Sequence, residues 1–259
     1  MRELESAQAA NAISPAQIYS MTGFSPFIEI LLQHTPVARS WIDAIERTCT
    51  QRTVLEIGPA GGKLTESILR VSSAVKLLEQ SSYFCEVLAN KFSNSTVPIT
   101  ITNASFPEAH RTKWDVICAR GVMLELLNEH SINSLADEFS QRLQERGTIL
   151  FDYPVAVDMP EQDVTKVLYE GIVDNCFVHY SYKYLGMRDG DYFAALRFER
   201  RKLNTKRSTE ERCLLRLKSF PTTAIEKAFC KKGFKIKCIE QPDAQTLFPG
   251  QLALFELRR

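Results

Sequence analysis

The sequence lacks both an excess of charge of either sign and any long apolar run. Lysine and arginine number 32 against 31 acidic residues, which gives a net charge of +1. This balance creates no overall field that would attract the chain to nucleic acid or to an anionic membrane. The chain has no apolar run long enough to span a bilayer, and its first residues, MRELESAQAANAIS, contain no apolar signal-peptide core. These absences predict a soluble, cytoplasmic protein with no membrane partner.

Paired cysteines are also missing. The seven cysteines are scattered, and none forms a Cys-x-x-Cys pair. An odd number without clustering favours reduced thiols over a disulfide framework or structural zinc. No closely spaced group of histidine and acidic residues indicates a catalytic metal. We therefore expect no metal ion.

What is present is the composition of an ordinary globular chain. Apolar residues make up 44% and charged residues 24% of 259 residues, which is enough for one large domain with an insertion. Residues 13–50 show helical spacing, as in Ile28, Leu31 and Leu32. The pattern predicts an N-terminal helical lid over residues 1–52.

From residue 53 onward, short apolar strands alternate with amphipathic helices. The predicted strands are 53–57, 75–78, 98–102, 115–119 and 148–151. The helix after the fourth strand is predicted to end at Gly147. Strands and helices that alternate at this spacing indicate parallel pairing with right-handed crossovers.

The alternation stops at residues 176–220. Apolar and charged side chains there follow a period of two, as in Leu196, Arg197 and Phe198, which is typical of an antiparallel sheet with one polar face. A helix from Thr222 and strands over 234–239 and 251–257 then resume the earlier pattern.

The predicted fold class is therefore α/β, with a doubly wound, mostly parallel sheet of seven strands. Residues 53–175 and 221–259 are expected to form this core. The antiparallel β insertion, residues 176–220, is expected to cover a substrate or to form a dimer contact.

A loop of small residues follows the first strand, in the stretch Val54-Leu55-Glu56-Ile57-Gly58-Pro59-Ala60-Gly61-Gly62. Small side chains let a ligand approach the backbone, and a branched side chain at Gly58 would occupy space that the ligand needs. Dinucleotide binding requires G-x-G-x-x-G, and this sequence has Ala60 and Lys63 where the second and third glycines belong. The loop instead reads acidic-x-Gly-x-small-x-Gly.

This motif resembles the first motif of class I S-adenosylmethionine-dependent methyltransferases. Glu79 ends the second strand, where that family places an acidic residue. The stretches WDVICARGVMLELL, SFPTTAIEKAFCKKGFKIKCIE and QLALFELRR resemble the family's fourth strand, last helix with penultimate strand, and final strand. The similarity runs in order through most of residues 53–257.

The resemblance implies S-adenosyl-L-methionine as the cofactor and a role for each matching position. Glu56 would lie beside the methionine amino group, and Glu79 would hold the ribose hydroxyls. Because Glu79 stands at a strand end, we expect it to hold little of the core. The remaining residues implied to bind cofactor are Tyr19, Gly58, Ala60, Gly62, Gln80, Asn103, Ala104, Ser105, Arg120 and Gly121.

The acceptor is predicted to be an oxygen or nitrogen atom of a small molecule. Relatives that methylate DNA bases or glutamine carry [Asp/Asn]-Pro-Pro-aromatic after the fourth strand, whereas this chain reads Ala119-Arg120-Gly121-Val122. The basic run at 197–207 contains Glu199 and fits a solvated hairpin. The candidate general bases are His130, Glu125 and Tyr153, with Asp152 and His179 also near the expected rim.

Three alternatives stay open at this point. They are an RNA- or protein-modifying methyltransferase, a non-catalytic module that binds S-adenosylmethionine, and an NAD-dependent oxidoreductase, which the loop disfavours at Lys63. Nucleic acid is disfavoured as a partner, and a homodimer is left open.

Overall fold

The computed structural model describes residues 12–13, 15–18, 24–34, 36–156, 165–173, 175–188, 191–205, 207–218, 220–241 and 251–259. Tyr19 lies outside these residues. Two compact units divide the chain. The insertion unit comprises Met1–Leu31 and Asp158–Ser219, and the core unit comprises Leu32–Val157 and Phe220–Arg259.

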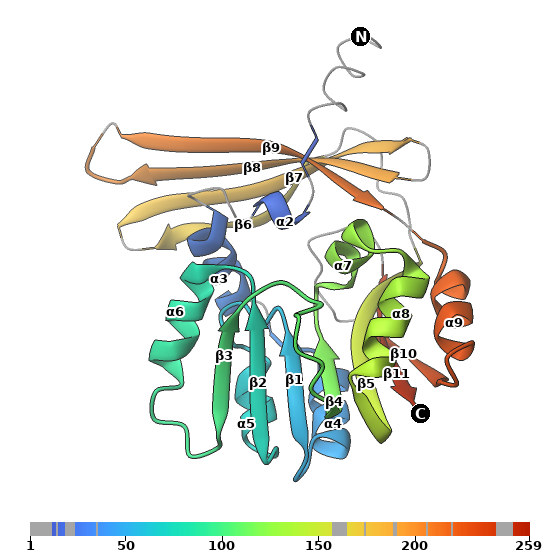
Figure 1. Cartoon of the computed structure of the whole chain (residues 1–259). Coiled ribbons are helices and arrows are strands. Elements are labelled where there is room, and N and C mark those ends of the chain that lie inside the picture. The colour runs from blue at the N-terminus through green and yellow to red at the C-terminus, as the bar shows by residue number, and fades with distance from the viewer. Residues whose placement is uncertain are drawn as a thin grey trace. The chain divides into compact units, whose positions relative to one another are not determined.

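The core unit contains a seven-stranded sheet (Figure 1). The strand order is β10-β11-β5-β4-β1-β2-β3, in which β5, β4, β1, β2 and β3 pair in parallel and β11 is antiparallel to both its neighbours. This arrangement confirms the predicted fold class. The strands are β1 (Thr53–Ile57), β2 (Ala74–Glu79), β3 (Ile99–Asn103), β4 (Trp114–Ala119), β5 (Leu143–Ala156), β10 (Lys235–Gln241) and β11 (Gln251–Arg258).

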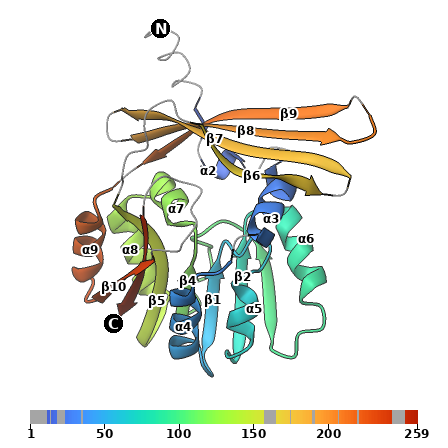
Figure 2. The same cartoon turned by 180° about the vertical axis from the view of Figure 1, so that it is seen from behind.

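Helices cover both faces of this sheet because its strands are apolar on both sides. One cluster of buried side chains packs α7, α8 and α9 against one face, around Phe139, Phe151 and Phe229. The other packs α4, α5 and α6 against the opposite face, around Trp41 and Ile68. Figure 2 shows α4 and α5 in front of the sheet. The helices are α4 (Arg39–Thr48), α5 (Thr65–Leu69), α6 (Ser82–Lys91), α7 (Met123–Glu129), α8 (Ile132–Gln141) and α9 (Thr222–Cys230).

The helix predicted to stop at Gly147 ends earlier, so that prediction is wrong. Helix α8 ends at Gln141, and the carbonyl of Arg142 already accepts a bond of 2.8 Å from the Trp114 amide, next to β4. The buried Arg142 side chain pairs with Glu138, which fixes this exit from the helix. Gly147 lies inside β5, where a Cβ would collide with the side chain of Leu143. Its small size therefore serves close packing within the strand.

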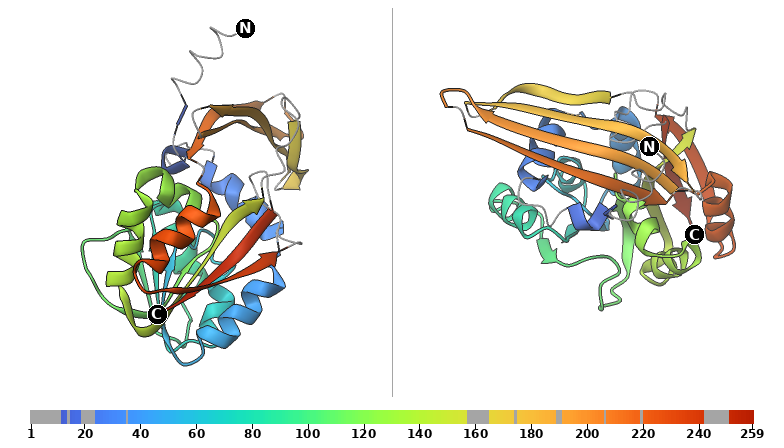
Figure 3. Two further views of the ribbon diagram at one scale, coloured as in Figure 1. Left: turned by 90° about the vertical axis from the view of Figure 1, so that its right-hand side faces the viewer. Right: turned by 90° about the horizontal axis from the view of Figure 1, so that it is seen from above.

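The insertion unit contains a four-stranded antiparallel sheet in the order β6-β7-β8-β9. The right panel of Figure 3 shows these long strands side by side. A short bridge joins Ile13 to Leu215 at the β9 edge. The described elements of this unit are α2 (Pro15–Ile18), the start of α3 (Phe24–His34), β6 (Thr165–Val173), β7 (Cys176–Arg188), β8 (Asp191–Lys202) and β9 (Ser208–Lys218).

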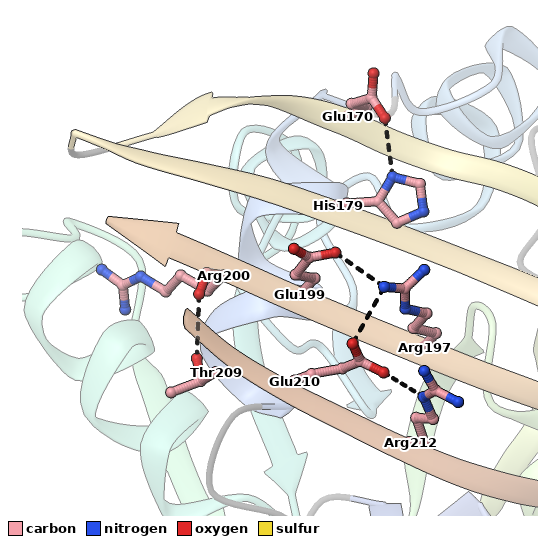
Figure 4. Close-up of polar contacts among 8 residues, drawn as sticks. All are labelled: Glu170, His179, Arg197, Glu199, Arg200, Thr209, Glu210 and Arg212. Carbon is pink, nitrogen blue, oxygen red and sulfur yellow. Dashed lines mark hydrogen bonds and ion pairs between the residues drawn. The ribbon is translucent and has the colours of Figure 1, made fainter. Parts of the chain in front are cut away.

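The two faces of this sheet differ in chemistry, as the period-two pattern predicts. On one face Tyr180 stacks on Phe198 with ring centroids 4.6 Å apart, and Phe24 of α3 meets Phe198 edge-on. The other face carries a network of charges, in which Arg197 bonds both Glu199 and Glu210 at 3.1 Å (Figure 4). These ion pairs are partly exposed, so each contributes little to stability.

The division of the chain differs from the predicted bounds of 53 and 176. Strand β6 precedes residue 176 and belongs to the insertion unit, yet its sequence TKVLYEGIV shows no clean alternation because a β-bulge between Val167 and Tyr169 interrupts the register. Helix α4 lies in the predicted lid, but its buried Trp41 and Ile45 belong to the core unit.

The structure describes all seven cysteines, and they form no disulfide; three of them, Cys49, Cys118 and Cys176, are buried. Among the described residues, no helix is both long and apolar enough to cross a bilayer.

Candidate functional site

Four charged side chains gather at the carboxyl ends of neighbouring strands in the core unit. The register aligns Glu56 of β1 with Cys118 of β4 and Leu150 of β5. It also aligns Glu56 with Leu77 of β2. Two positions further along each neighbouring strand are Asp152 within β5, Arg120 just after β4, and Glu79 at the end of β2. Because side chains alternate along a strand, positions two apart face the same side. We call Glu56, Glu79, Arg120 and Asp152 the charged row.

Two glycines in the loop after β1 have positive φ and are closely packed against side chains. Gly58 has φ +64° and donates its amide to the Leu78 carbonyl at 2.9 Å, while Gly62 has φ +72°. A Cβ on Gly58 would overlap Cγ1 of Val122, and one on Gly62 would lie 2.7 Å from the Phe92 ring. Both glycines are thus required by the protein's own packing, in addition to any ligand. Ala60 adopts φ +46°.

Glu56 is buried at the base of this loop. Only 2% of its surface is exposed, and one carboxylate oxygen accepts a bond of 2.7 Å from the Thr65 hydroxyl. Burial raises the pKa of Glu56 to about 7, which the Thr65 bond and the charge of Arg120 oppose. The negative charge of Glu79 adds to the raised pKa of Glu56, and the charge of Lys91 opposes it.

Glu79 ties the β1 loop to the end of β2. One of its oxygens accepts the Ala60 amide at 3.0 Å and the other accepts the Ser81 amide at 2.8 Å. Its side chain is 3% exposed, and burial raises its pKa against these backbone bonds. The expectation that Glu79 holds little of the fold is therefore wrong, since two amides depend on it.

The loop after β3 docks against the same corner. The Asn103 side chain donates to the carbonyls of Glu79 and Gln80 at 3.0 and 2.9 Å. The Ala104 amide donates to the Glu79 carbonyl, and the Ser105 hydroxyl lies 3.4 Å from Oε1 of Gln80. The structure thus brings Gln80, Asn103, Ala104 and Ser105 together beside Glu79, as a shared ligand site requires.

Asp152 anchors the loop after β4. It is 6% exposed and accepts the Gly121 amide at 2.6 Å, and Gly121 has φ +74° with open space where a Cβ would stand. Burial raises the pKa of Asp152, opposed by the Gly121 bond and the charge of Arg120. The buried Trp41 indole of α4 lies near this carboxylate, and its Nε1 forms no hydrogen bond within the described residues. Asp152 therefore fixes the backbone at Gly121, next to Arg120, and the family resemblance implies that both of these residues bind the cofactor.

The predicted bases occupy different surroundings. Nε2 of His130, at the end of α7, lies 3.3 Å from the Phe106 carbonyl, and Glu125 is half-buried on α7. The hydroxyl of Tyr153 is bonded on both sides to the Phe220 backbone at 3.0 Å, so it joins β5 to the segment before α9. In the insertion unit, His179 pairs with Glu170 at 2.9 Å on the charged face (Figure 4).

The sequence pattern did not single out Asp152 as an anchor, or Thr65 and Trp41 as neighbours of the buried carboxylates. Asp152 was predicted only as a candidate base. Asp152 lies two residues after Leu150, the β5 residue that the register aligns with Glu56. This relationship could identify Asp152 only once the register of β5 was known. Among the residues that the structure describes, no cluster of histidine, cysteine and acidic side chains is arranged to hold a metal ion.

The donor set of the charged row fits a ligand that carries positive charge. Glu56, Glu79 and Asp152 are buried, and within the described part of the chain none of them has a cation at ion-pair distance. A buried carboxylate without a counter-ion is costly, so a cationic ligand would stabilise all three. S-adenosylmethionine, with its ammonium and sulfonium groups, has this character.

Sheet order, helix placement and the loop after β1 together define the fold of class I S-adenosylmethionine-dependent methyltransferases. An S-adenosylmethionine-dependent methyltransferase from Clostridium acetobutylicum has a TM-score of 0.63 at 14% identity, over 91% of this chain and 97% of its own.

Two enzymes that act on sugars are also similar. The amino pentose methyltransferase CalS10 from Micromonospora echinaspora, solved with S-adenosylmethionine bound, has a TM-score of 0.62 at 13% identity, over 85% of this chain and 87% of its own. The sugar N-methyltransferase KedS8 from a Streptoalloteichus species has a TM-score of 0.64 at 12% identity, over 86% and 85%. No protein-family model and no curated protein sequence matches the chain. At these identities the likeness is one of fold.

Proposed function

We propose that the protein is an S-adenosylmethionine-dependent methyltransferase that transfers a methyl group to an oxygen or nitrogen atom of a small molecule. The observation that carries this proposal is the meeting of the glycine loop and the charged row at one edge of a class I methyltransferase sheet. In open α/β sheets, ligands bind at the carboxyl ends of the strands.

The proposed cofactor roles are those that the family resemblance implies, and the contacts in this corner support several of them. Glu56 is proposed to face the methionine ammonium, and Glu79 the ribose hydroxyls. Asn103 is proposed to position the loop that meets adenine, because it bonds the backbone on either side of Gln80. The remaining proposed cofactor residues are Tyr19, Gly58, Ala60, Gly62, Gln80, Ala104, Ser105, Arg120 and Gly121.

The protein's own residues are proposed to orient the reacting groups and to accept one proton from the methyl acceptor. When bound, S-adenosylmethionine supplies a methyl group made reactive by the adjacent sulfonium. Glu79 and Asp152 fix the loops after β1 and β4, so the reacting groups meet a preformed corner. If Nε2 of His130 donates to the Phe106 carbonyl, Nδ1 is the nitrogen that accepts a proton. We therefore propose His130 as the base, with Glu125 as the second candidate.

The acceptor class rests on the fold-level likeness to enzymes whose substrates are sugars. We propose that the aromatic face of the insertion unit, formed by Tyr180, Phe198 and their neighbours, covers the acceptor or a second copy of the chain. We also propose that the protein works in the cytoplasm, where the cofactor and reduced thiols are available.

The test is binding followed by transfer. Titration calorimetry should show binding of S-adenosylmethionine and S-adenosylhomocysteine and no heat with NAD. Incubation with methyl-labelled cofactor and a metabolite extract should then give a labelled small molecule by mass spectrometry. Binding of NAD alone would overturn the proposal. Binding without transfer to any fraction would favour a non-catalytic module.

A further inference from the structure

The hairpin that joins β8 to β9 carries a local excess of positive charge. Residues 200–209, RRKLNTKRST, contain five basic residues and no acidic one. The basic residues that the structure describes there are all exposed and are Arg200, Arg201, Lys202 and Arg207. None of these four forms an ion pair with another described residue. The neighbouring acidic side chains, Glu199 and Glu210, are already paired with Arg197 (Figure 4). The net charge of +1 for the whole chain therefore hides a strongly basic hairpin.

Exposed aliphatic side chains lie beside these charges. Ile172 of β6 is 66% exposed and Leu203 of the β8–β9 turn is 45% exposed. The Leu203 amide donates to the Asn175 carbonyl at 2.9 Å, which joins the β8–β9 turn to the β6–β7 turn. Figure 1 shows the paired ends of β6 and β7 and of β8 and β9 at the same end of this sheet. Isolated exposed apolar residues are common, but here two of the three large ones that the structure describes gather at one end of one sheet.

The positive charges lie on both faces of this end of the sheet. Successive residues of a strand point to opposite faces, so Arg201 shares the charged face with Arg197, whereas Arg200 and Lys202 lie on the other face. A planar partner that meets the end of the sheet can contact both faces at once, whereas a partner lying on one face cannot. We call this group the basic tip, and its members are Ile172, Arg200, Arg201, Lys202, Leu203 and Arg207.

An anionic lipid surface fits the basic tip better than nucleic acid does. Proteins hold single-stranded nucleic acid by stacking its bases on aromatic rings. The aromatic residue next to the tip, Phe177, is half-buried, and the Arg201 guanidinium already lies over its ring, 5.2 Å from the ring centroid. Aliphatic side chains instead gain free energy at the boundary between lipid headgroups and acyl chains, where basic side chains meet anionic headgroups. The tip offers both kinds of side chain together.

We propose that the basic tip docks the protein reversibly on an anionic lipid surface, with Ile172 and Leu203 entering the headgroup layer. The inference concerns the insertion unit alone and does not depend on methyl transfer. It differs from the expectation of no membrane partner, which used the net charge of the whole chain and the lack of a spanning segment. A docking hairpin needs neither of these, because each basic residue near an anionic surface strengthens binding about fivefold, and this effect is confined to about 8–10 Å.

The experiment measures sedimentation of the whole chain with sucrose-loaded vesicles. One set of vesicles contains phosphatidylcholine with about 30% phosphatidylserine, and the other contains phosphatidylcholine alone. We expect the protein to sediment with the first set only. Raising NaCl from about 0.1 M to about 0.5 M should release most of it, because salt screens the attraction. Equal binding to both sets would overturn the proposal.

Two variants separate the charges from the aliphatic side chains. Lys202→Gln combined with Arg207→Gln removes two exposed charges whose side chains bond no other described residue, and it should weaken binding to anionic vesicles about 25-fold. Leu203→Asn keeps a residue suited to a turn and should weaken binding about three- to tenfold. Both variants should melt like the wild type, because the replaced side chains are exposed.

Lys235→Gln combined with Lys237→Gln is the matched control. These two residues of β10 are exposed and form no ion pair with another described residue, so the control has the same net charge as the double variant of the tip. It should bind anionic vesicles like the wild type. If it weakens as much as the tip variant, the overall charge of the chain causes the attraction and the proposal is wrong.

Three further outcomes would contradict the proposal. If Leu203→Asn binds as tightly as the wild type, the tip does not enter the headgroup layer. If a labelled single-stranded RNA binds the wild type but not the tip variant, and anionic vesicles bind neither, the partner is nucleic acid. If the wild type binds neither vesicles nor RNA, the hairpin is a solvated end of the sheet. None of these results affects the proposed methyl transfer, which is measured separately.

Discussion

The side chain of Val122 occupies the space into which a Cβ on Gly58 would project. Gly58 directly follows β1 and Val122 directly precedes α7, so this contact joins the glycine loop to the start of α7. The sequence predicted that a side chain at Gly58 would collide with the ligand. The structure shows that it would collide first with the protein.

Gly58→Ala is therefore expected to lower the free energy of unfolding by about 1–3 kcal/mol and to abolish cofactor binding. Both the collision and the positive φ contribute to this cost. Adding Val122→Ala should recover part of the stability, because it removes the collision but leaves the strained φ. Urea unfolding and calorimetry of the single and double variants measure the two effects. Gly121→Ala, with open space around it, is the control that carries only the backbone cost.

Glu79→Ala should reduce both cofactor affinity and stability. A bond between ribose and a charged carboxylate contributes about 1.5–3 kcal/mol, which corresponds to roughly 10- to 150-fold in affinity. The same substitution leaves the Ala60 and Ser81 amides without their acceptor, at a further cost of about 1–3 kcal/mol. Glu79→Gln should lie between, since it keeps one acceptor oxygen. A Glu79→Ala variant that melts like the wild type would show that the two amide bonds are dispensable.

The stability of the ligand-free protein should fall as pH rises from about 4.5 to about 7. The pKa of Glu56 is about 7 in the folded chain against an ordinary 4.5, so over this range the folded state holds a proton that the unfolded state has lost. The destabilisation is complete above the folded pKa and amounts to at most about 3.4 kcal/mol, at 1.36 kcal/mol per pKa unit. Burial raises the pKa of Glu79 and Asp152 in the same direction.

Glu56→Gln removes this titration. The variant should be more stable than the wild type at pH 8 and should lose the advantage at pH 5, when both are measured by urea unfolding without cofactor. A wild-type stability that rises between pH 5 and pH 8, and a variant that follows it in parallel, would contradict the assignment.

Tyr153→Phe separates a structural from a catalytic role. The hydroxyl of Tyr153 exchanges two bonds with the Phe220 backbone, so its loss should lower the free energy of unfolding by about 1–2 kcal/mol. We expect kcat to remain within a few-fold of the wild-type value. A loss of 100-fold or more in kcat with normal melting would restore Tyr153 as the base. The parallel variant His130→Gln should lose activity and keep its melting temperature.

Much of the core unit was predictable because its signals are local. Strands β1, β2 and β4 are short and mostly apolar, and β3 alternates Ile with Thr. Glycine at positions 58 and 62 of the β1 loop is favoured by the positive φ there. The prediction failed where long-range pairing overrides local preference. Helix α8 ended at Gln141 because the next residues pair with Trp114, and β6 was missed because its bulge removes the alternation.

Some residues of the candidate site could be predicted from the sequence alone, and others join the site only through the tertiary structure. The sequence by itself determined the glycine loop, Glu56 and Glu79, because these residues follow one another at fixed spacing along β1 and β2. Tertiary structure alone decided that Asp152 joins them. The Asp152 carboxylate reaches the Gly121 amide only when β5 lies beside β4 in the observed register. The two residues are 31 positions apart, and nothing in the sequence between them indicates this pairing. The burial of Glu56 also depends on tertiary structure, because Thr65, at the start of α5, packs on that face of the sheet and donates its hydroxyl to the carboxylate.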